Sequence, residues 1–254
     1  MGAPHTHVVI LAAGKGSRLG ALSAESPKWL LDVGGELLAD RQLEGIARAQ
    51  DAIGSVRVVT GHAAGALDRF LAERGQDQIA TVFNPDYATI NNWYSVLLAL
   101  RAIEDPEARV IVVNCDMFAE AADMAAFFEA CASTEEEALI AVDLERVLTD
   151  ESMKVEARPD GTLDRIGKVG MDEPVGEYVG MLMARGAELA SLRRELEAFV
   201  GDPAAVNEWY EGAVGRAAAK GARWTIWPMP STRWVEIDDD GDLAAAVELV
   251  RATR

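Results

Sequence analysis

Short apolar segments alternate with amphipathic segments along the first half of the chain. The apolar segments are rich in valine and isoleucine and end in polar or turn-forming residues, which is typical of buried parallel strands. They span residues 7–13, 55–61, 79–85 and 109–117. The segments between them repeat their apolar residues every three or four positions, which predicts helices packed against a core. They span residues 39–50, 63–75 and 91–105.

This alternation predicts an α/β fold with a mainly parallel, Rossmann-like sheet and helices on both of its faces. After about residue 134 the pattern changes to shorter strands, with a hairpin that turns at Pro159-Asp160-Gly161. The expected strands span 137–145, 153–169 (the hairpin), 177–184, 223–230 and 233–237, and the expected helices span 186–199, 204–220 and a last stretch from about Asp242. We therefore expect one domain over residues 1–254 with a small mixed β elaboration.

Composition supports a single folded domain and restricts its partners. A chain of 254 residues, half of them hydrophobic, can bury a substantial core. The formal net charge of -18 argues against a nucleic-acid partner, because such binding needs a basic face. A small phosphorylated ligand is compatible with this charge, since it needs only a local cluster of lysine and arginine.

The cysteine content and the lengths of the apolar segments indicate a cytoplasmic protein. Cys115 and Cys131 are too few for a disulfide framework, and a reducing compartment is the simpler interpretation. No apolar stretch is long enough to span a membrane, and residues 8–13 are too short for the core of a signal peptide. We expect no membrane partner.

A loop rich in glycine and basic residues follows the first expected strand, in the stretch VVILAAGKGSRLG at residues 8–20. In an open α/β sheet, ligands bind beyond the carboxyl ends of the strands, so this loop is well placed for one. Gly14 and Gly16 would let backbone N–H groups approach phosphate oxygens, and the start of a following helix would add its positive dipole end. A polyphosphate is therefore the expected ligand. The basic residues nearby are Lys15, Arg18 and Lys28.

The spacing of the glycines excludes two familiar nucleotide-binding loops. In a dinucleotide fingerprint the third glycine would stand one position before Gly20, and in a Walker A loop a serine or threonine would replace Gly16. An ordinary glycine turn, with its basic side chains in solvent, is the alternative interpretation. The combination LAAGKGSRL…PKWLL is more specific than the glycines alone.

This combination resembles the N-terminal signature of the nucleotidyltransferase superfamily, whose members join a nucleoside triphosphate to a phosphorylated small molecule and release pyrophosphate. The resemblance spans residues 8–38. It implies a fold of the nucleotide-diphospho-sugar transferase type and a loop that wraps the triphosphate, with Arg18 and Lys28 in contact with its phosphates. The nucleotide-binding residues that it implies in this region are Leu11, Ala12, Ala13, Gly14, Lys15, Gly16, Ser17, Arg18 and Lys28.

Carboxylates near two expected strand ends are candidate ligands for a metal ion. A triphosphate carries Mg²⁺, which prefers one or two carboxylates together with phosphate oxygens and water. The resemblance puts the metal-binding aspartate of the family at Asp116, whose alternative role is to cap the next helix. In RWVEIDDDGDL, Glu236 and Asp238 would share one face of a strand, and we prefer Asp238 as the ligand with Glu236 next. Three aspartates are expected to cap or flank the last helix: Asp239, Asp240 and Asp242.

The transfer chemistry needs little further machinery. A phosphate monoester or phosphonate is already largely ionised near neutral pH, so its oxygen can attack the α-phosphorus without a strong general base. Catalysis then consists of alignment and charge neutralisation. The expected catalytic residues are Lys28, Arg18 and Asp116, with Mg²⁺ as the cofactor.

The middle of the chain indicates a branch of the superfamily. The stretch NPDYATINNWYSV at residues 84–96 stands where sugar-1-phosphate members carry a glutamine- and glycine-rich segment. It is similar to the bacterial choline-phosphate cytidylyltransferases and their relatives acting on phosphonates or inositol phosphate. This resemblance implies CTP as the donor, with Asn84 and Ser95 near the nucleotide. It implies choline phosphate or an alkylphosphonate, such as 2-aminoethylphosphonate or 2-hydroxyethylphosphonate, as the acceptor. The implied acceptor-binding residues are Asn92, Lys154, Glu177 and Tyr178.

On this interpretation, about residues 1–134 bind the nucleotide and about residues 135–254 bind the acceptor. Aromatic side chains can cage a quaternary ammonium group or simply fill the core. The aromatic residues available for either role are Trp93, Tyr94, Tyr178, Trp209 and Tyr210.

Two other functions remain open. A sugar-1-phosphate nucleotidyltransferase is disfavoured by residues 84–96. A non-catalytic regulatory module that binds nucleotide is disfavoured by the presence of Arg18, Lys28 and Asp116. A homodimer is expected only because it is the commonest assembly of soluble proteins.

Overall fold

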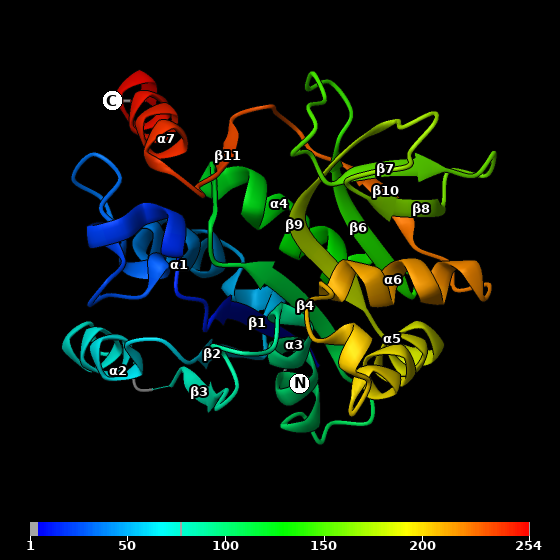
Figure 1. Ribbon diagram of the computed structural model, residues 1–254, viewed down its shortest axis with the longest axis horizontal. Coiled ribbons are helices and arrows are strands. Elements are labelled where there is room, and N and C mark those ends of the chain that lie inside the picture. The colour runs from blue at the N-terminus through cyan, green and yellow to red at the C-terminus, as the bar shows by residue number, and fades with distance from the viewer. Residues whose placement is uncertain (1–4, 77, 254) are drawn as a thin grey trace.

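Seven consecutive neighbouring strands form the main part of a β-sheet at the centre of the molecule (Figure 1). The computed structural model describes residues 5–76 and 78–253. In spatial order the strands are β10, β6, β9, β4, β1, β2 and β3. Their bounds are β1 Thr6–Ala12, β2 Ser55–Thr60, β3 Ala80–Phe83, β4 Arg109–Asn114, β6 Ala138–Asp143, β9 Gly176–Ala184 and β10 Thr225–Pro228. Strands from both halves of the chain therefore share one sheet.

Most neighbouring strands in this sheet are parallel. β1 pairs in parallel with β2 and β4, β2 pairs in parallel with β3, and β6 pairs in parallel with β10. β9 is antiparallel to both of its neighbours, β4 and β6. These pairings confirm the prediction of an α/β fold with a mainly parallel sheet.

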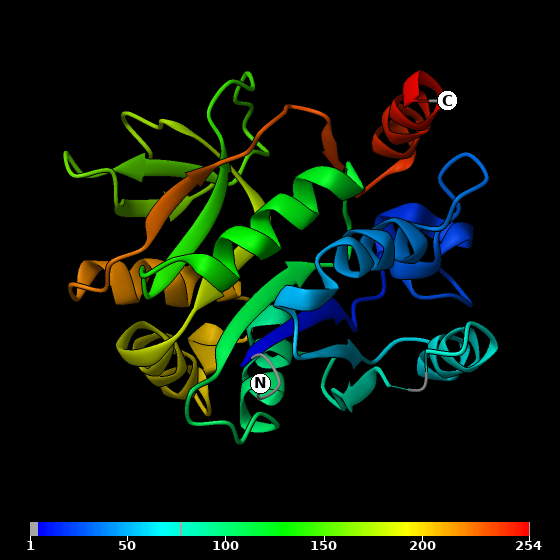
Figure 2. The same cartoon turned by 180° about the vertical axis from the view of Figure 1, so that it is seen from behind.

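Helices cover both faces of the sheet (Figures 1 and 2). Successive residues of a strand point to opposite faces, and β1 follows this rule: Val8 and Ile10 pack into one core, and Val9 and Leu11 into the other. The first core is closed by α1 (Leu38–Arg48), α2 (Ala64–Glu73) and α4 (Ala121–Ser133). The second core is closed by α3 (Asn92–Arg101), α5 (Gly186–Phe199) and α6 (Tyr210–Ala219).

A hairpin of β7 (Lys154–Ala157) and β8 (Leu163–Gly167) extends the sheet beside β9. Gly161 in its turn has a φ of 80°, in the left-handed region that glycine adopts without steric cost. The hairpin predicted at residues 153–169 is therefore confirmed.

A second, small sheet joins the middle of the chain to its C-terminal region. β5 (Met117–Ala119) pairs antiparallel with β11 (Trp234–Glu236), and α7 (Asp240–Thr253) follows β11 directly. A separate apolar cluster, which includes Phe118 and Val235, packs under α7. Figure 1 shows α7 beside β11, away from the centre of the main sheet. This sheet was missed because its strands are only three residues long.

Several boundaries differ from the predicted ones. The two closely spaced strands at 223–237 belong to different sheets, since β10 pairs with β6 and β11 pairs with β5. The helix predicted at 204–220 begins only at Tyr210, because Pro203–Ala205 forms a separate 3₁₀ turn. The last helix begins at Asp240, and α4 was not identified from its sequence, which is apolar around most of its circumference.

The glycine loop is not followed by an α-helix, contrary to our expectation. Ser17–Leu22 forms 3₁₀ turns that are broken at Gly20, whose φ and ψ are 53° and -119°. The first α-helix starts at Leu38. The positive dipole end expected next to the phosphate loop is therefore absent in the part of the chain that the structure describes, and backbone N–H groups and basic side chains remain there to attract an anion.

Both cysteines, Cys115 and Cys131, are buried free thiols. Within residues 5–76 and 78–253, no helix combines the length and the apolar character needed to cross a bilayer.

Candidate active site

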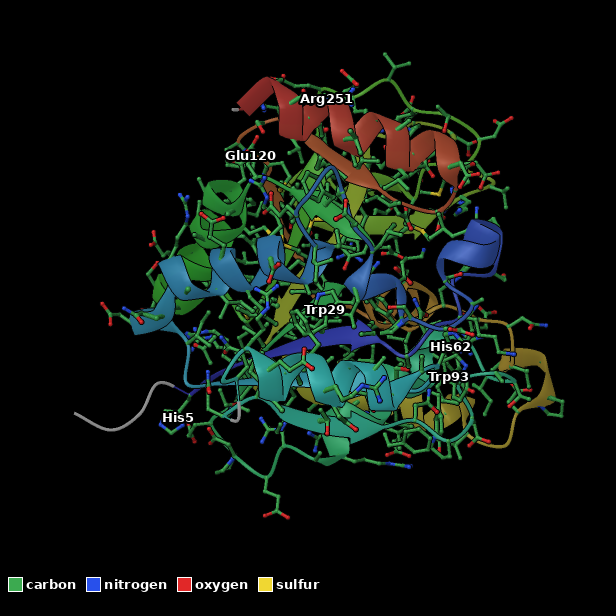
Figure 3. The ribbon with its side chains drawn as sticks, turned by 90° about the vertical axis from the view of Figure 1, so that its left-hand side faces the viewer. His5, Trp29, His62, Trp93, Glu120 and Arg251 are labelled. Carbon is green, nitrogen blue, oxygen red and sulfur yellow. The ribbon has the colours of Figure 1, made fainter. Side chains whose placement is uncertain are left out.

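A cavity of about 280 Å³ opens where β1 and β4 end. Its wall comes from the loop after β1, from the segment between β3 and α3, from the loop after β4, and from parts of β9, α6 and β11. In Figure 3, His62 and Trp93 lie on the side of these strand ends, and His5, which precedes β1, lies on the opposite side. The cavity is therefore at the edge of the sheet where ligands of open α/β folds bind.

The structure brings most of the expected site residues together around this cavity. Those that line it are Leu11, Ala13, Gly14, Gly16, Arg18, Lys28, Asn84, Asn92, Ser95, Asp116, Tyr178, Glu236 and Asp238. Ser17 lines a smaller adjoining hollow. Ala12 points into the core under α1, and Lys15 is exposed, with its Nζ 6.0 Å from the ring of Tyr87.

The backbone conformation and the close packing at position 16 of the glycine loop favour glycine. Gly16 has a φ of 58°, and a Cβ there would lie 3.3 Å from the Cβ of Ser23 and 3.4 Å from Cε of Lys28. Ser23 donates a hydrogen bond to the carbonyl of Gly16 at 2.7 Å, and His62 Nε2 donates to the carbonyl of Ser23 at 2.8 Å. Ser23 and His62 thus support the loop, and no motif in the sequence pointed to either of them.

Lys28 is the central cation of the cavity. It stands at the start of the 3₁₀ helix η2 (Lys28–Leu30) and is only 9% exposed. Its Nζ lies 2.7 Å from Asp238 Oδ1 and 3.2 Å from Asp116 Oδ2, while Arg18 Nη2 lies 2.6 Å from the other oxygen of Asp238. Burial lowers the pKa of Lys28, but the charges of Asp116 and Asp238 outweigh it and raise that pKa above its ordinary value. Lys28 therefore remains charged across the physiological pH range.

Three carboxylates form one cluster beside Lys28. One oxygen each from Asp116, Glu236 and Asp238 lies within 4.8 Å of the others. The small sheet creates this arrangement, because Glu236 pairs with Met117 and the N–H of Ile237 donates to the carbonyl of Asp116 at 2.9 Å. Both Glu236 and Asp238 thus reach the cluster, and its geometry does not favour Asp238 over Glu236 as the metal ligand.

The donor set of this cluster suits a hard divalent cation. Mg²⁺ prefers carboxylate oxygens, and Asp116 Oδ1 is buried without a hydrogen-bond partner among the described residues. Burial, together with the charges of Asp116 and Asp238, raises the pKa of Glu236 to about 8. Like charges held this close are costly without a cation between them. The residues therefore fit a Mg²⁺ ion chemically.

The neighbouring aspartates have structural roles. Asp242 accepts hydrogen bonds from the N–H groups of Asp238 and Asp239, and Asp239 accepts from those of Gly241 and Asp242. They cap the start of α7 and hold the turn that carries Asp238. Asp116 does not cap α4, whose capping position is Glu120.

Gln42 of α1 ties η2 to the loop that carries Asp116. It is fully buried, and its side-chain oxygen accepts a hydrogen bond from Trp29 Nε1 at 2.9 Å. Its Nε2 donates to the carbonyls of Asn114 and Met117, at 3.0 and 2.9 Å. Trp29, labelled in Figure 3, lies in the interior beside α1. These bonds fix the backbone on both sides of Asp116 relative to the segment that carries the lysine.

The predicted nucleotide residues of the middle segment form a buried pair. Asn84 Nδ2 donates to Ser95 Oγ at 2.9 Å, and both side chains are almost fully buried. Asn92, at the start of α3, accepts a hydrogen bond from the N–H of Tyr210 at 3.0 Å. The neighbouring Asn91 caps α3.

Of the four residues predicted to bind the acceptor, two do not line the cavity. Lys154 donates to the carbonyl of Lys168 at 2.9 Å and does not line the cavity, and Glu177 lies 3.7 Å from Arg146, also outside it. The cavity is lined instead by residues that were not predicted as acceptor ligands, namely Asn114, Met153, Lys168 and Glu211, and by Trp209, one of the five aromatic candidates.

The five aromatic residues divide between cavity and core. Tyr178 and Trp209 line the cavity, and Lys168 Nζ lies 5.7 Å from the centre of the Trp209 ring. Trp93 and Tyr210 are buried in the core, and Tyr94 packs against it. The Tyr178 hydroxyl lies 2.7 Å from that of Tyr210, which donates to Asn114 Oδ1 at 2.9 Å.

Glu211 contributes the most deeply buried carboxylate of the cavity wall. It is 5% exposed, and its Oε2 has no hydrogen-bond partner within the described ranges. Burial, together with the charge of Asp116, raises the pKa of this carboxyl to about 7. A group with such a pKa exchanges its proton near neutral pH.

Two curated proteins are similar in sequence to this chain. The chain is 31% identical over 246 residues to the CMP-5'-(3-aminopropyl)phosphonate synthase of Streptomyces rubellomurinus, covering 92% of this chain and 37% of that protein. It is 29% identical over 110 residues to the choline-phosphate cytidylyltransferase of Streptococcus pneumoniae, covering 43% of this chain and 44% of that one. The chain thus matches less than half the length of each of these two curated relatives.

Solved structures share the fold. The CTP:phosphocholine cytidylyltransferase of Streptococcus pneumoniae superposes with a TM-score of 0.73 at 18% identity, covering 96% of this chain and 99% of that one. The inositol-1-phosphate CTP transferase of T. maritima does so with a TM-score of 0.77 at 17% identity, covering 98% and 96%. The family model of the MobA-like NTP transferase domain matches residues 8–213. The chain therefore belongs to the family of MobA-like NTP transferase domains.

Proposed function

We propose that the protein is a Mg²⁺-dependent cytidylyltransferase, which joins CMP from CTP to a small phosphorylated or phosphonylated acceptor and releases pyrophosphate. One observation carries this proposal: Lys28 lies 2.7 Å from Asp238 and 3.2 Å from Asp116 at the edge of the glycine loop. A lysine and a carboxylate cluster side by side are the two sources of charge that phosphoryl transfer requires.

Each charged group would act according to its position. The N–H groups of the glycine loop and Arg18 would bind the outer phosphates and stabilise the departing pyrophosphate. Lys28 would bind the α-phosphate, where negative charge builds up as the new bond forms. Asp116, Glu236 and Asp238 would hold Mg²⁺, which when bound would supply further positive charge to the phosphate oxygens. Gln42 would hold Lys28 and Asp116 at a fixed distance from each other.

The acceptor would be choline phosphate or an alkylphosphonate such as 2-aminoethylphosphonate or 2-hydroxyethylphosphonate. The sequence of residues 84–96 and the names of the two curated relatives support a cytidylyl donor and an acceptor of this kind. The acceptor oxygen is already ionised near neutral pH, so no strong base is needed to activate it. The orientation of the two substrates would supply most of the remaining rate enhancement.

Pyrophosphate release tests the proposal directly. The purified protein would be incubated with Mg²⁺ and each of CTP, UTP, dTTP, ATP and GTP. Each nucleotide would be paired with choline phosphate, 2-aminoethylphosphonate, 2-hydroxyethylphosphonate, inositol-1-phosphate or glucose-1-phosphate. We expect release with CTP and a non-sugar acceptor, and none when Mg²⁺ is removed with a chelator.

Other outcomes would identify the alternatives. Release only with glucose-1-phosphate would make the protein a sugar-1-phosphate nucleotidyltransferase. Tight CTP binding without release from any pair would indicate a non-catalytic nucleotide-binding module.

A further inference from the structure

The wall of the cavity carries one carboxylate that the proposed transfer chemistry does not use. Glu211 is the second residue of α6 and is 5% exposed. It lines the cavity together with Trp209 and Tyr178, which come from the part of the chain that follows β6. It does not belong to the cluster of Asp116, Glu236 and Asp238.

The charge of Glu211 has no counter-ion in the part of the chain that the structure describes. The cations of the cavity are already paired: Lys28 with Asp116 and Asp238, Arg18 with Asp238, and Lys168 with Glu151 at 3.2 Å. Glu211 forms no ion pair with any described residue. The side chains of Tyr210 and Asn114 hydrogen-bond to this carboxylate, but neither carries a charge, and Oε2 accepts no hydrogen bond. A buried carboxylate left in this state is costly unless a proton or a cation compensates it.

The surroundings of Glu211 favour a cation supplied by a ligand. Its position in the first turn of α6 favours the charged carboxylate, since the helix dipole is positive at that end. The neighbouring Trp209, which is 43% exposed, presents an indole ring to the same cavity, and such a ring attracts cations. A primary ammonium group can donate hydrogen bonds to a carboxylate oxygen, whereas a quaternary ammonium group has no N–H to donate.

We infer that Glu211 is a specificity-determining residue, which binds a primary ammonium group at the end of the acceptor remote from its phosphonate. This inference rests on the proposed function and specifies the acceptor further: an ω-aminoalkyl phosphonate or phosphate is preferred over uncharged and quaternary analogues. Lys168 lines the same cavity and can attract the anionic end of such an acceptor. The acceptor would thus carry opposite charges at its two ends, as the cavity wall does.

The test compares acceptors that differ only in the amino group. Pyrophosphate release with CTP would be measured for 3-aminopropylphosphonate, for propylphosphonate and for choline phosphate, and kcat/KM determined for each. We expect the wild-type protein to prefer 3-aminopropylphosphonate over propylphosphonate by at least about tenfold, because a site built to hydrogen-bond a polar group discriminates strongly against its absence. In Glu211→Gln this ratio should fall to near one, with the larger loss on the aminated acceptor.

Two further variants separate specificity from folding. Glu211→Asp keeps the charge on a shorter side chain and should retain part of the preference. Glu208→Gln removes a charge three positions earlier, at a residue that does not line the cavity, and should leave the ratio unchanged. Thermal unfolding of all three variants identifies any that has lost its fold.

The outcomes distinguish this inference from the proposed function. Equal kcat/KM values of the wild-type protein for the aminated and unaminated acceptors would overturn the inference and leave the cytidylyltransferase assignment intact. So would an equal loss on both acceptors in a folded Glu211→Gln variant, because that result describes a structural residue. Absence of release with CTP and every acceptor would overturn the proposed function, and the inference with it.

Discussion

The end of the cavity that we propose binds the nucleotide (the nucleotide end) and the end that we propose binds the acceptor (the acceptor end) are built in different ways. At the nucleotide end, Gly14, Gly16, Arg18 and Lys28 come from one stretch of the chain shortly after β1, and all of them line the cavity. At the acceptor end, the lining residues come from three segments, around Lys168, Tyr178 and Glu211. The sequence predicted the first group. For the second it predicted Asn92 and Tyr178, which line the cavity, and Lys154 and Glu177, which do not.

The difference reflects the ligand that each end would meet. A triphosphate presents the same oxygens to every enzyme, and one loop with backbone N–H groups and two or three cations can surround it. An acceptor varies in size and charge, and it meets side chains from hairpin, strand and helix together. The geometry of such a wall depends on packing between distant segments. Substitutions at the two ends of the cavity should therefore affect activity to different extents.

The largest effect is expected at the nucleotide end from Lys28→Ala. We expect kcat for pyrophosphate release to fall by about 10²–10³-fold, the usual cost of removing a group that stabilises charge in the transition state. Steady-state kinetics with CTP and the preferred acceptor would measure it. Arg251→Ala is the control, since this exposed residue of α7 lies far from His62 and Trp93 in Figure 3 and pairs only with Glu248 among the described residues. A Lys28→Ala rate equal to that of the control would remove Lys28 from the mechanism.

A smaller effect is expected from Gln42→Leu, which removes the connection between η2 and the Asp116 loop. We expect kcat to fall by about 10–100-fold with a smaller change in KM. This is the usual cost of removing a residue that orients the groups in contact with a metal ion. The free energy of unfolding should fall by about 1–3 kcal/mol, because Trp29 Nε1 loses its buried acceptor. Gln78→Leu, at an exposed position, is the matched control. A loss of stability with an unchanged kcat would make Gln42 a purely structural residue.

The acceptor end can be tested with two lysines. Lys168→Ala should raise the KM for the acceptor by about tenfold and leave the KM for CTP nearly unchanged, because it removes a cation from the cavity wall. Lys154→Ala should have a smaller effect on the acceptor KM, since its ammonium group is engaged with the carbonyl of Lys168. Initial-rate kinetics with each substrate varied in turn would measure both. The reverse order would restore Lys154 as the acceptor ligand that the sequence indicated.

The smallest effect is a pH dependence of stability. The pKa of Glu211 is raised to about 7 by burial, whereas a glutamate in an unfolded chain titrates near about 4.3. Between these two pKa values the folded protein binds more protons than the unfolded chain. The free energy of unfolding therefore decreases as the pH rises toward about 7, and above that pH this carboxyl causes no further decrease.

Glu211→Gln cannot titrate, so the difference in melting temperature, variant minus wild type, should increase by a few degrees between about pH 5 and about pH 8. Thermal unfolding at several pH values without Mg²⁺ would measure it, with Glu208→Gln as the control. A difference that stays constant with pH would mean that Glu211 keeps one protonation state throughout.

The sequence predicted the sheet and the phosphate loop because both depend on local patterns. The valine-rich runs gave β1 to β4 within a few residues, and the glycine loop gave Arg18 and Lys28. The pairing of β5 with β11 could not be predicted, since each strand is three residues long and the partners are far apart in the chain. For this reason the sequence could not decide between Glu236 and Asp238.

Two residues left a usable signal in the sequence. Gln42 stands on the apolar stripe of α1, among Leu38, Ala39 and Ile46, where a polar side chain must find buried partners. Glu211 stands on the buried side of α6, beside Tyr210 and Val214. What these partners are depends on tertiary packing, and only the structure supplies them.

The ion pair between Lys28 and Asp238 joins residues 210 positions apart, which affects the order in which the protein gains and loses function. Closing so long a loop carries a large entropic cost, so contacts of this kind tend to form late in folding. The β11–α7 segment packs mainly on a separate apolar cluster and contributes one side chain, Trp234, to the main cores, so its detachment would disturb those cores less than loss of a sheet strand would. Mild denaturant should therefore inactivate the protein before it unfolds the sheet, and on refolding the nucleotide loop should be complete before catalysis returns.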